Sequence, residues 1–293
     1  MNLAPSKMNV TAQTTRRRYV LSQPCVPKDL DIPAPLLKNL AEAELALVQT
    51  EVNACLHVRE SIQRFDNFAL NEQALQAPVA PLWHRLGEAS VSRCHPTEQG
   101  IPWRSDMEQR TLDSRCEALL LSLEQPVPDA FVAELLMICA MVKGLPLTNL
   151  RTNGVELAGD KNGWSWQFPD SHGISKCLSA LHGALRQRRF SNAIVDATVA
   201  YGILNWMHPV GDGNGRTSRM VFNAILRRAG MPKDHYVPIK EINHLARGGH
   251  EVRLRYTVAT GDWEELLEYF VNAIALYKVL LHQEVTPAES RMW

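Results

Sequence analysis

The sequence lacks several features that mark well-known classes of protein. Its six cysteines are scattered, with no C-x-x-C pair and no cluster of Cys and His at metal-ligand spacing. Basic and acidic residues balance at 31 each, so no overall field attracts nucleic acid or anionic membranes. The most apolar stretch, residues 131–142, is too short to span a bilayer, and no signal peptide is recognisable. We therefore expect a cytoplasmic protein with reduced thiols, no metal cage, and no nucleic-acid or membrane partner.

The common nucleotide and hydrolase motifs are also missing. The chain contains no G-x-x-x-x-G-K-[ST], H-E-x-x-H or G-x-S-x-G, and no G-x-G-x-x-G follows a strand. These absences argue against P-loop ATPases, zinc proteases, serine hydrolases and dinucleotide-binding folds. With 45% apolar and 21% charged residues, the composition is nevertheless that of an ordinary globular protein.

The spacing of apolar residues predicts a mainly helical protein. Apolar positions recur every three or four residues over 36–65, 107–123, 128–142, 175–186, 194–207, 215–229 and 263–282. Prolines between residues 76 and 104 predict a loop there, and residues 1–33 show no periodicity, so we expect a flexible lead-in. Alternation over 150–168 around Asn162-Gly163 predicts one β-hairpin.

The segment from His208 to Arg219, between two predicted helices, has the composition of a phosphate-binding site. Glycines at 211, 213 and 215 let consecutive backbone N–H groups turn inward, and the following helix adds the positive end of its dipole. Arg216 and Arg219 can grip phosphate oxygens from the first turn of that helix. Asp212 can hold Mg²⁺ on those phosphates, and a neutral His208 can accept a proton from a hydroxyl.

The same segment, His-Pro-Val-Gly-Asp-Gly-Asn-Gly-Arg-Thr-Ser-Arg, resembles the signature of Fic domain proteins, His-x-Phe-x-Asp/Glu-Gly-Asn-Gly-Arg-x-x-Arg. Every defined position matches except Val210, where the family usually has Phe packed in the core. The resemblance implies a mainly α fold: a Fic-type helical bundle with a small β-hairpin flap and an N-terminal helical extension. We divide the chain into a flexible N-terminal segment (1–33), the helical extension (34–118) and the Fic catalytic domain (119–285).

The resemblance also implies a function: a protein adenylyltransferase that transfers AMP from ATP, with Mg²⁺, to a Tyr, Thr or Ser hydroxyl of a target protein. His208 corresponds to the general base and Asp212 to the Mg²⁺ ligand. An anion hole corresponds to Gly213, Asn214 and Gly215, with Asn214 also positioning the α-phosphate. Arg216 and Arg219 correspond to the residues that hold the phosphates, Arg219 chiefly the γ-phosphate. In the flap, the residues that align the target backbone correspond to Val155, Glu156 and Leu157.

Two other functions stay open at this stage. Fic relatives that phosphorylate their targets have Lys where this chain has Gly215, so Gly215 favours AMP transfer. The phosphate-binding segment from His208 to Arg219 would nevertheless accept other phosphate-containing donors, for UMP or phosphocholine transfer. A non-catalytic or toxin-type module held by a partner protein is the second alternative. A homo-oligomer is compatible with the sequence.

The source of inhibition is also open. The inhibitory motif of the family, Ser/Thr-x-x-x-Glu-Gly/Asn, has no clean copy here, since Thr152 to Glu156 falls in the flap and precedes Leu157. An antitoxin-like partner supplies the inhibitor, or the inhibitory helix is degenerate, or the enzyme is unrestrained.

Overall fold

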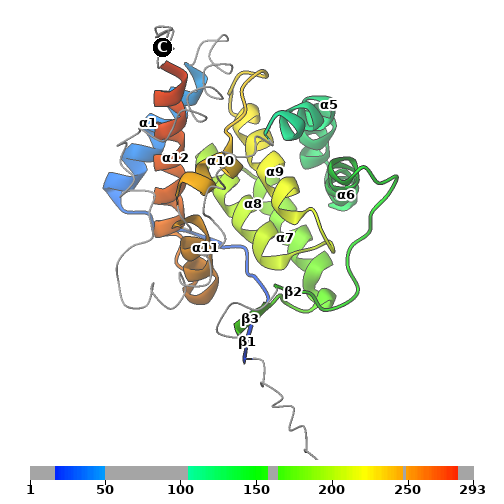
Figure 1. Cartoon of the computed structure of the whole chain (residues 1–293). Helices are drawn as coiled ribbons and strands as arrows, with labels where there is room; N and C mark the ends of the chain where they lie inside the picture. Colours follow the sequence, from blue (N-terminus) through cyan, green and yellow to red (C-terminus); the bar gives the residue numbers. More distant parts are fainter. Residues whose placement is uncertain (1–16, 50–104, 158–163, 247–248, 283–293) are drawn as a thin grey trace, which may run out of the picture.

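A computed structural model describes residues 17–49, 105–157, 164–246 and 249–282 and shows a mainly helical protein (Figure 1). The elements are, in chain order, β1 (Arg17–Val20), α1 (Ala34–Val48), α5 (Ser105–Glu124), α6 (Asp129–Lys143), β2 (Glu156–Leu157), β3 (Trp164–Gln167), a short 3-10 helix (Ser171–Gly173), α7 (Ile174–Arg186), α8 (Ala193–Met207), α9 (Asn214–Arg228), α10 (Ile239–Leu245), α11 (Gly249–Thr260) and α12 (Glu264–His282).

Helices α8 and α9 form the centre of the bundle. Helix α8 is apolar on all sides and almost entirely buried, which requires neighbours all round it. In Figure 1, α5, α6 and α7 lie on one side of the α8–α9 pair, and α1, α11 and α12 lie on the other. Asn192 caps α8 by accepting hydrogen bonds from the N–H groups of Ile194 and Val195. This cap fixes the N-terminal end of α8, and the connection to α9 begins at the opposite end of the helix, at His208.

Most predicted helices are confirmed. The predicted ranges from residue 107 onward correspond to α5, α6, α7, α8, α9 and α12, whereas α10 and α11 were not predicted. Of the helix predicted over 36–65, α1 accounts for the part up to Val48; residues 50–65, the loop at 76–104 and the hairpin turn lie outside the described residues. The predicted domain boundary at 118/119 falls inside α5, and the division into domains stays a prediction.

The predicted hairpin is confirmed and is part of a three-stranded sheet with the order β1-β3-β2. Strand β2 pairs antiparallel with β3, with Leu157 opposite Trp166, whereas β1 pairs parallel with β3. The structure differs here from the prediction of a flexible segment over 1–33, because residues 17–20 are a strand and Pro24 and Val26 are buried. The segment is too short to show periodicity, and its partner strand lies far away in the sequence.

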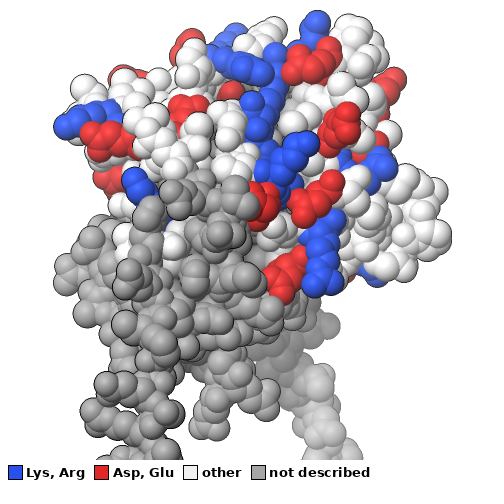
Figure 2. All heavy atoms as spheres, turned by 90° about the horizontal axis from the view of Figure 1, so that it is seen from above, with Lys and Arg blue, Asp and Glu red and all other residues white. Residues whose placement is uncertain are grey.

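The surface agrees with the balanced charge of the sequence. On the face shown in Figure 2, Lys and Arg side chains are interspersed with Asp and Glu. In the described ranges, no helix has the combination of length and apolarity that a bilayer crossing requires.

Buried His250 gives stability a specific pH dependence. It lies among the rings of Tyr201, Tyr269 and Phe270, and burial lowers its pKa to about 4. Above pH 6.5 the His250 ring is mostly neutral in both the folded and the unfolded chain. As the pH falls toward 4, the ring becomes protonated in the unfolded chain but stays mostly neutral in the folded chain, so the lower pH favours unfolding. We therefore expect the stability of wild type relative to His250→Phe to fall by about 2 kcal/mol between pH 7 and pH 5. Urea unfolding at both pH values tests this, and a difference that does not change with pH would contradict it.

Candidate active site

The loop between α8 and α9 takes its shape from Gly213 and Asn214. Gly213 has φ +95°, and a Cβ there would lie 2.9 Å from Cys139 Sγ, so the position requires glycine. The Asn214 side chain accepts from the Val210 N–H (3.0 Å) and donates to the Val210 carbonyl (2.8 Å). Its amide therefore closes the loop, and the predicted contact of Asn214 with the α-phosphate stays a prediction.

Val210, where the signature has Phe, lies in the core. It is 4% exposed. Together with Leu135, Leu178 and Leu204 it lines a cavity of about 20 Å³. The smaller side chain thus leaves only a small void under the loop.

His208 stands at the end of α8 with its protonation state set by its surroundings. Its backbone is left-handed, with φ 51°, and its N–H still bonds the Leu204 carbonyl. Its Nδ1 lies 3.1 Å from the Asn205 carbonyl, which can only accept, so Nδ1 carries the proton and Nε2 has the lone pair. Burial lowers the pKa of the ring, against the opposing effect of the Asn205 bond. The ring stacks on Phe168, with centroids 3.8 Å apart.

Buried Arg151 holds the backbone around His208. Its Nε donates to the His208 carbonyl (2.6 Å), its Nη2 to the carbonyls of Met207 (3.0 Å) and Pro169, and its Nη1 to the Asn153 carbonyl (2.9 Å). The Arg151 backbone N–H also donates to the Pro209 carbonyl (2.9 Å). The Arg151 guanidinium therefore connects both ends of the flap, at Asn153 and Pro169, to His208, whose backbone has a positive φ.

Arg151→Lys should separate this positioning role from nucleotide binding. An ammonium cannot reproduce the forked geometry, so we expect the kcat of the predicted reaction at His208 to fall about 10²-fold, with KM for the predicted nucleotide substrate changed less than about threefold. Steady-state kinetics measure the split. Arg115→Lys, which alters a half-buried pair with Glu134, serves as the control. A rise in KM with unchanged kcat would contradict a positioning role.

Asp212 lies on the outer side of the loop among charges of both signs. Its side chain is 67% exposed, and its Oδ2 lies 3.6 Å from both Lys143 Nζ and Arg216 Nη2. Its Oδ1 accepts from the Gly213 N–H (2.7 Å). Arg216 also donates to the Val142 carbonyl (2.6 Å). The Asp212 carboxylate therefore accepts from the N–H of Gly213, one of the predicted anion-hole donors, and lies next to the cations of Lys143 and Arg216.

Arg219 is occupied by a partner that the sequence analysis missed. Glu108, on the first turn of α5, is fully buried and accepts from Arg219 Nε (2.9 Å) and Nη2. Tyr236 donates its hydroxyl to the same carboxylate (2.9 Å). The contact with Glu108 raises the pKa of Arg219 despite the opposing effect of burial. The second arginine of the segment is thus neutralised within the chain.

A cavity of about 240 Å³ brings part of the predicted site together. His208, Gly215 and Arg219 line it, and so does Leu157 of the flap. Asp212, Gly213, Asn214 and Arg216 lie in the adjoining loop and helix, and Val155 and Glu156 lie along the flap strand rather than on the cavity wall. The remaining wall comes from the flap, α8 and the region of α10 and α11: Leu21, Trp166, Phe168, Tyr201, Asn205, Trp206, Lys240, Asn243, His250, Glu251, Leu254, Arg255 and Val258.

Comparison with known protein families assigns the region that contains the His208–Arg219 segment to a family. Residues 137–226, which include the flap, α8 and most of α9, match the model of the Fic/DOC family. Residues 137–226 of the chain are a Fic/DOC family domain. Members of the family are generally transferases, AMPylators among them. The resemblance of His208–Arg219 to the Fic signature is thereby confirmed.

Individual relatives of this Fic/DOC protein are distant. A segment of 57 residues is 40% identical to "Protein adenylyltransferase Fic" of Nematostella vectensis and covers 16% of this chain but only 13% of that relative. Among solved structures, a Fic family protein from Desulfovibrio desulfuricans G20 is similar, with 19% identity, a TM-score of 0.49, and coverage of 80% of this chain and 73% of that one. Fic-1 (aa134 - 508) from C. elegans is similar with 18% identity, a TM-score of 0.45, and coverage of 84% and 73%.

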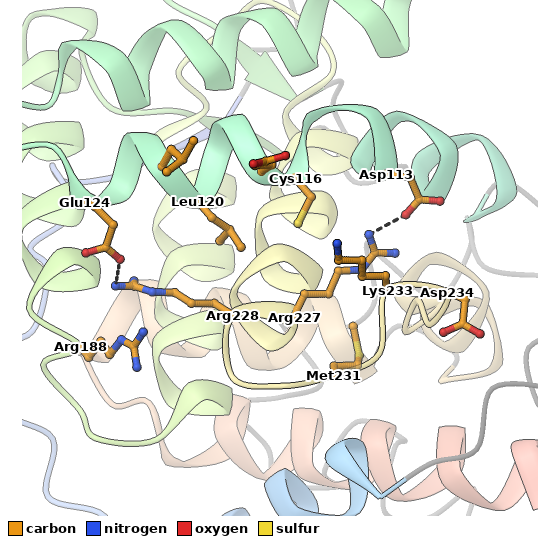
Figure 3. A pocket seen from close by; sticks show the side chains of 12 residues that line it. Asp113, Cys116, Leu120, Glu124, Arg188, Arg227, Arg228, Met231, Lys233 and Asp234 are labelled. Atoms are coloured by element: carbon orange, nitrogen blue, oxygen red, sulfur yellow. Dashed lines mark hydrogen bonds and ion pairs between the residues drawn. The ribbon is translucent and has the colours of Figure 1, made fainter.

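A larger groove of about 720 Å³ lies between α5 and the far end of α9 in this Fic/DOC protein (Figure 3). Its lining residues are distinct from those of the His208 cavity. Two ion pairs cross it, Arg227 with Asp113 and Arg228 with Glu124, each at 2.5 Å. These pairs link the middle and the end of α5 to the last turn of α9, and their carboxylates are 46% and 55% exposed, so each contributes little to stability.

Proposed function

We propose that this Fic/DOC protein transfers AMP from ATP to a hydroxyl group of a target protein. One observation supports the proposal above others: His208, with its lone pair on Nε2, lines the same cavity as Gly215 and Arg219 at the start of α9. The proposed proton acceptor, His208, and the N-terminal residues of α9 that would bind phosphate thus line the same cavity. The target would be a protein with a Tyr, Thr or Ser side chain that reaches this cavity.

In the proposed reaction the target hydroxyl attacks the α-phosphorus of ATP. A bond forms between the target oxygen and the α-phosphorus, the α–β phosphoanhydride bond breaks, and pyrophosphate leaves with the bonding electrons. His208 Nε2 takes the hydroxyl proton. The N–H groups of Gly213, Asn214 and Gly215 and the guanidinium of Arg216 stabilise the negative charge on the phosphates. Positioning and charge stabilisation would supply most of the rate, as in other phosphate-transfer enzymes.

The residues present fit a magnesium ion bound through the nucleotide. In the part of the chain that the structure describes, no group of three metal-ligating side chains occurs. Mg²⁺ commonly binds through one or two carboxylates together with phosphate oxygens and water, and exposed Asp212 beside the loop can supply that carboxylate. When bound there, Mg²⁺ would neutralise phosphate charge.

We also propose that Glu108 restrains the enzyme. In the Fic resemblance, an inhibitory glutamate pairs with the second arginine of the motif, which here is Arg219, and thereby blocks the γ-phosphate. Glu108 escaped the sequence search because Arg104 stands four residues before it and Gln109 follows it, so the motif is absent. This proposal places the inhibitor within the chain rather than in an antitoxin-like partner.

The neutral form of His208 is the proposed base, which fixes the direction of the pH dependence. Burial lowers its pKa below the ordinary 6.5, so the ring stays unprotonated as the pH falls toward that lowered value. We expect kcat/KM to be flat on the acid side of neutrality down to that point, and then to fall about tenfold per pH unit. A pH–rate profile measures it. An acid limb that begins above pH 6.5 would contradict the assignment.

ATP labelled separately at the α- and γ-phosphates tests the proposed reaction. Label transferred to protein from the α-phosphate alone is the expected result. Label from the γ-phosphate alone would mean a kinase, and no transfer from either, with displacement by UTP or CDP-choline in a binding assay, would favour another donor. A protein that binds no nucleotide at all would favour a non-catalytic module.

A further inference from the structure

The first turn of α5, which carries Glu108, is also held by a contact at Ser105. Ser105 is the first residue of α5 and is 3% exposed, and both its backbone N–H (3.2 Å) and its hydroxyl donate to the carboxylate of Glu241. Glu241 belongs to α10 and is fully buried. A buried carboxylate that the proposed reaction does not use therefore holds the start of the helix that carries Glu108.

The contact between Ser105 and Glu241 is suited to fixing a helix start. The first N–H groups of an α-helix have no partner within the helix, and the helix dipole places partial positive charge there. A carboxylate that accepts from the first of these N–H groups satisfies one donor, and a hydrogen bond to a charged acceptor is stronger than one between neutral groups. Because Ser105 and Glu108 are three residues apart, they lie on the same face of α5. Glu241 therefore holds the face of α5 that carries Glu108.

The chain that leads into α10 is hydrogen-bonded to the helix that carries Arg219. Val237 exchanges two hydrogen bonds with the buried side chain of Asn223 in α9: its N–H donates to Oδ1 (2.7 Å), and its carbonyl accepts from Nδ2 (3.2 Å). Asn223 Nδ2 also donates to the Arg219 carbonyl (3.0 Å). The neighbouring Tyr236 donates to the Glu108 carboxylate. The chain before α10 thus links the first turn of α5 to the turn of α9 that follows Arg219.

Helix α10 also borders the cavity of the proposed reaction. Lys240 and Asn243, which stand on either side of Glu241 in the sequence, line that cavity. Tyr269 of α12 donates its hydroxyl to the Asn243 side chain (2.6 Å) and so connects α10 to the long C-terminal helix. One short helix therefore contacts the start of α5 through Glu241 and the proposed nucleotide space through Lys240 and Asn243.

We propose that Glu241 is a positioning residue for the restraint: through Ser105 it holds the first turn of α5 in the place where Glu108 reaches Arg219. When the contact between Ser105 and Glu241 opens, the first turn of α5 is released and Glu108 leaves Arg219 more readily. The population of the unrestrained enzyme then rises. Glu241 acts through Ser105 and Glu108, not through the reacting atoms. This inference rests on the proposed function, and on the restraint by Glu108, for its effect on AMP transfer.

Ser105→Ala in the full chain tests the contact with a small change that keeps the backbone hydrogen bond. Ser122→Ala is the matched control, because Ser122 is also buried in α5 but its hydroxyl donates within the helix, to the Leu119 carbonyl (2.6 Å). The amides of residues 109–112 bond to the carbonyls of the first turn of α5, so they report its opening. They should exchange about tenfold faster in Ser105→Ala than in Ser122→Ala, after correction for global stability with the amides of α8. Equal exchange in the two variants would overturn the proposal.

Label transfer from ATP labelled at the α-phosphate tests the link to Glu108. We expect Ser105→Ala to raise AMP transfer about tenfold, as should Glu241→Gln, which keeps the size of the side chain and removes its charge. Ser122→Ala should leave the rate as it was. In the Glu108→Ala background neither Ser105→Ala nor Glu241→Gln should raise the rate further, because the restraint is already absent. An equal factor in both backgrounds, or no rise in the wild-type background, would overturn the proposal.

A double-mutant cycle of unfolding tests the same link without any enzymatic activity. If the contact at Ser105 and the pair of Glu108 with Arg219 hold one turn together, losing either contact weakens the other. Ser105→Ala and Glu108→Ala combined should then change the equilibrium constant of urea unfolding about tenfold less than the product of their separate factors. Factors that simply multiply would overturn the proposal. Absence of label transfer in every variant, including Glu108→Ala, would defeat the proposed function, and hydrogen exchange and this cycle would then decide on Glu241.

Discussion

Replacing His208 by alanine is expected to lower the rate of the proposed AMP transfer by about 10²–10⁴-fold, the usual contribution of a general base. The loss should appear in kcat, because the loop and helix start that bind the phosphates remain in place. Nucleotide affinity, measured by calorimetry on the same variant, should change by less than about threefold. The structure gives the reason: the imidazole has its lone pair on Nε2 and is held by the Asn205 carbonyl and by Phe168.

A matched histidine control is available at His172. Its side chain is 92% exposed and lies outside the cavity, in the short 3-10 helix that precedes α7. His172→Ala should transfer AMP at the wild-type rate. Label that persists at the wild-type rate in His208→Ala, or is lost equally in His172→Ala, would contradict the assignment of the base.

Replacing Glu108 by alanine is expected to raise AMP transfer by about 10²-fold, because Arg219 then becomes available to the γ-phosphate. The same change leaves a buried arginine without its carboxylate, so the free energy of unfolding without nucleotide should fall by about 3–5 kcal/mol. Mg-ATP should restore part of this loss, because a ligand that binds only the folded state stabilises it. Radiolabel transfer and thermal unfolding with and without Mg-ATP measure the two effects.

Glu134→Ala is the matched control for that variant. It removes the carboxylate of another pair, Arg115 with Glu134, whose side chains are 28% and 18% exposed and lie away from Arg219. It should lower stability less and leave the transfer rate as it was. If Glu108→Ala lost activity and Mg-ATP failed to stabilise it, the glutamate would be a structural partner of Arg219 rather than a restraint.

The loop between α8 and α9 and the two helices themselves were predictable because their signals are local. The apolar periods of α8 and α9 and the glycines between them lie within one stretch of about thirty-five residues, and the Fic signature covers its centre. The hairpin was predictable for the same reason, since alternation and an Asn-Gly turn adjoin each other in the sequence.

What the sequence could not show depends on partners that are distant along the chain. Glu108 meets Arg219 across 111 positions, and Trp206 meets the Ser22 carbonyl across 184. Strand β1 has four residues, too few for a periodic signal, and exists as a strand because β3 offers it an edge. The hydrogen bonds of the Asn214 side chain to Val210 were not predictable either, because the sequence alone does not show whether an amide in this loop bonds the loop backbone or a ligand.

A crystal structure of the Glu108→Ala variant with Mg-ATP tests the central claim most directly. The account predicts the phosphates against the N–H groups of Gly213, Asn214 and Gly215, with the γ-phosphate on Arg219, the metal beside Asp212, and His208 Nε2 facing the α-phosphorus. Nucleotide bound elsewhere, or phosphates turned away from the start of α9 with His208 facing the interior, would contradict it.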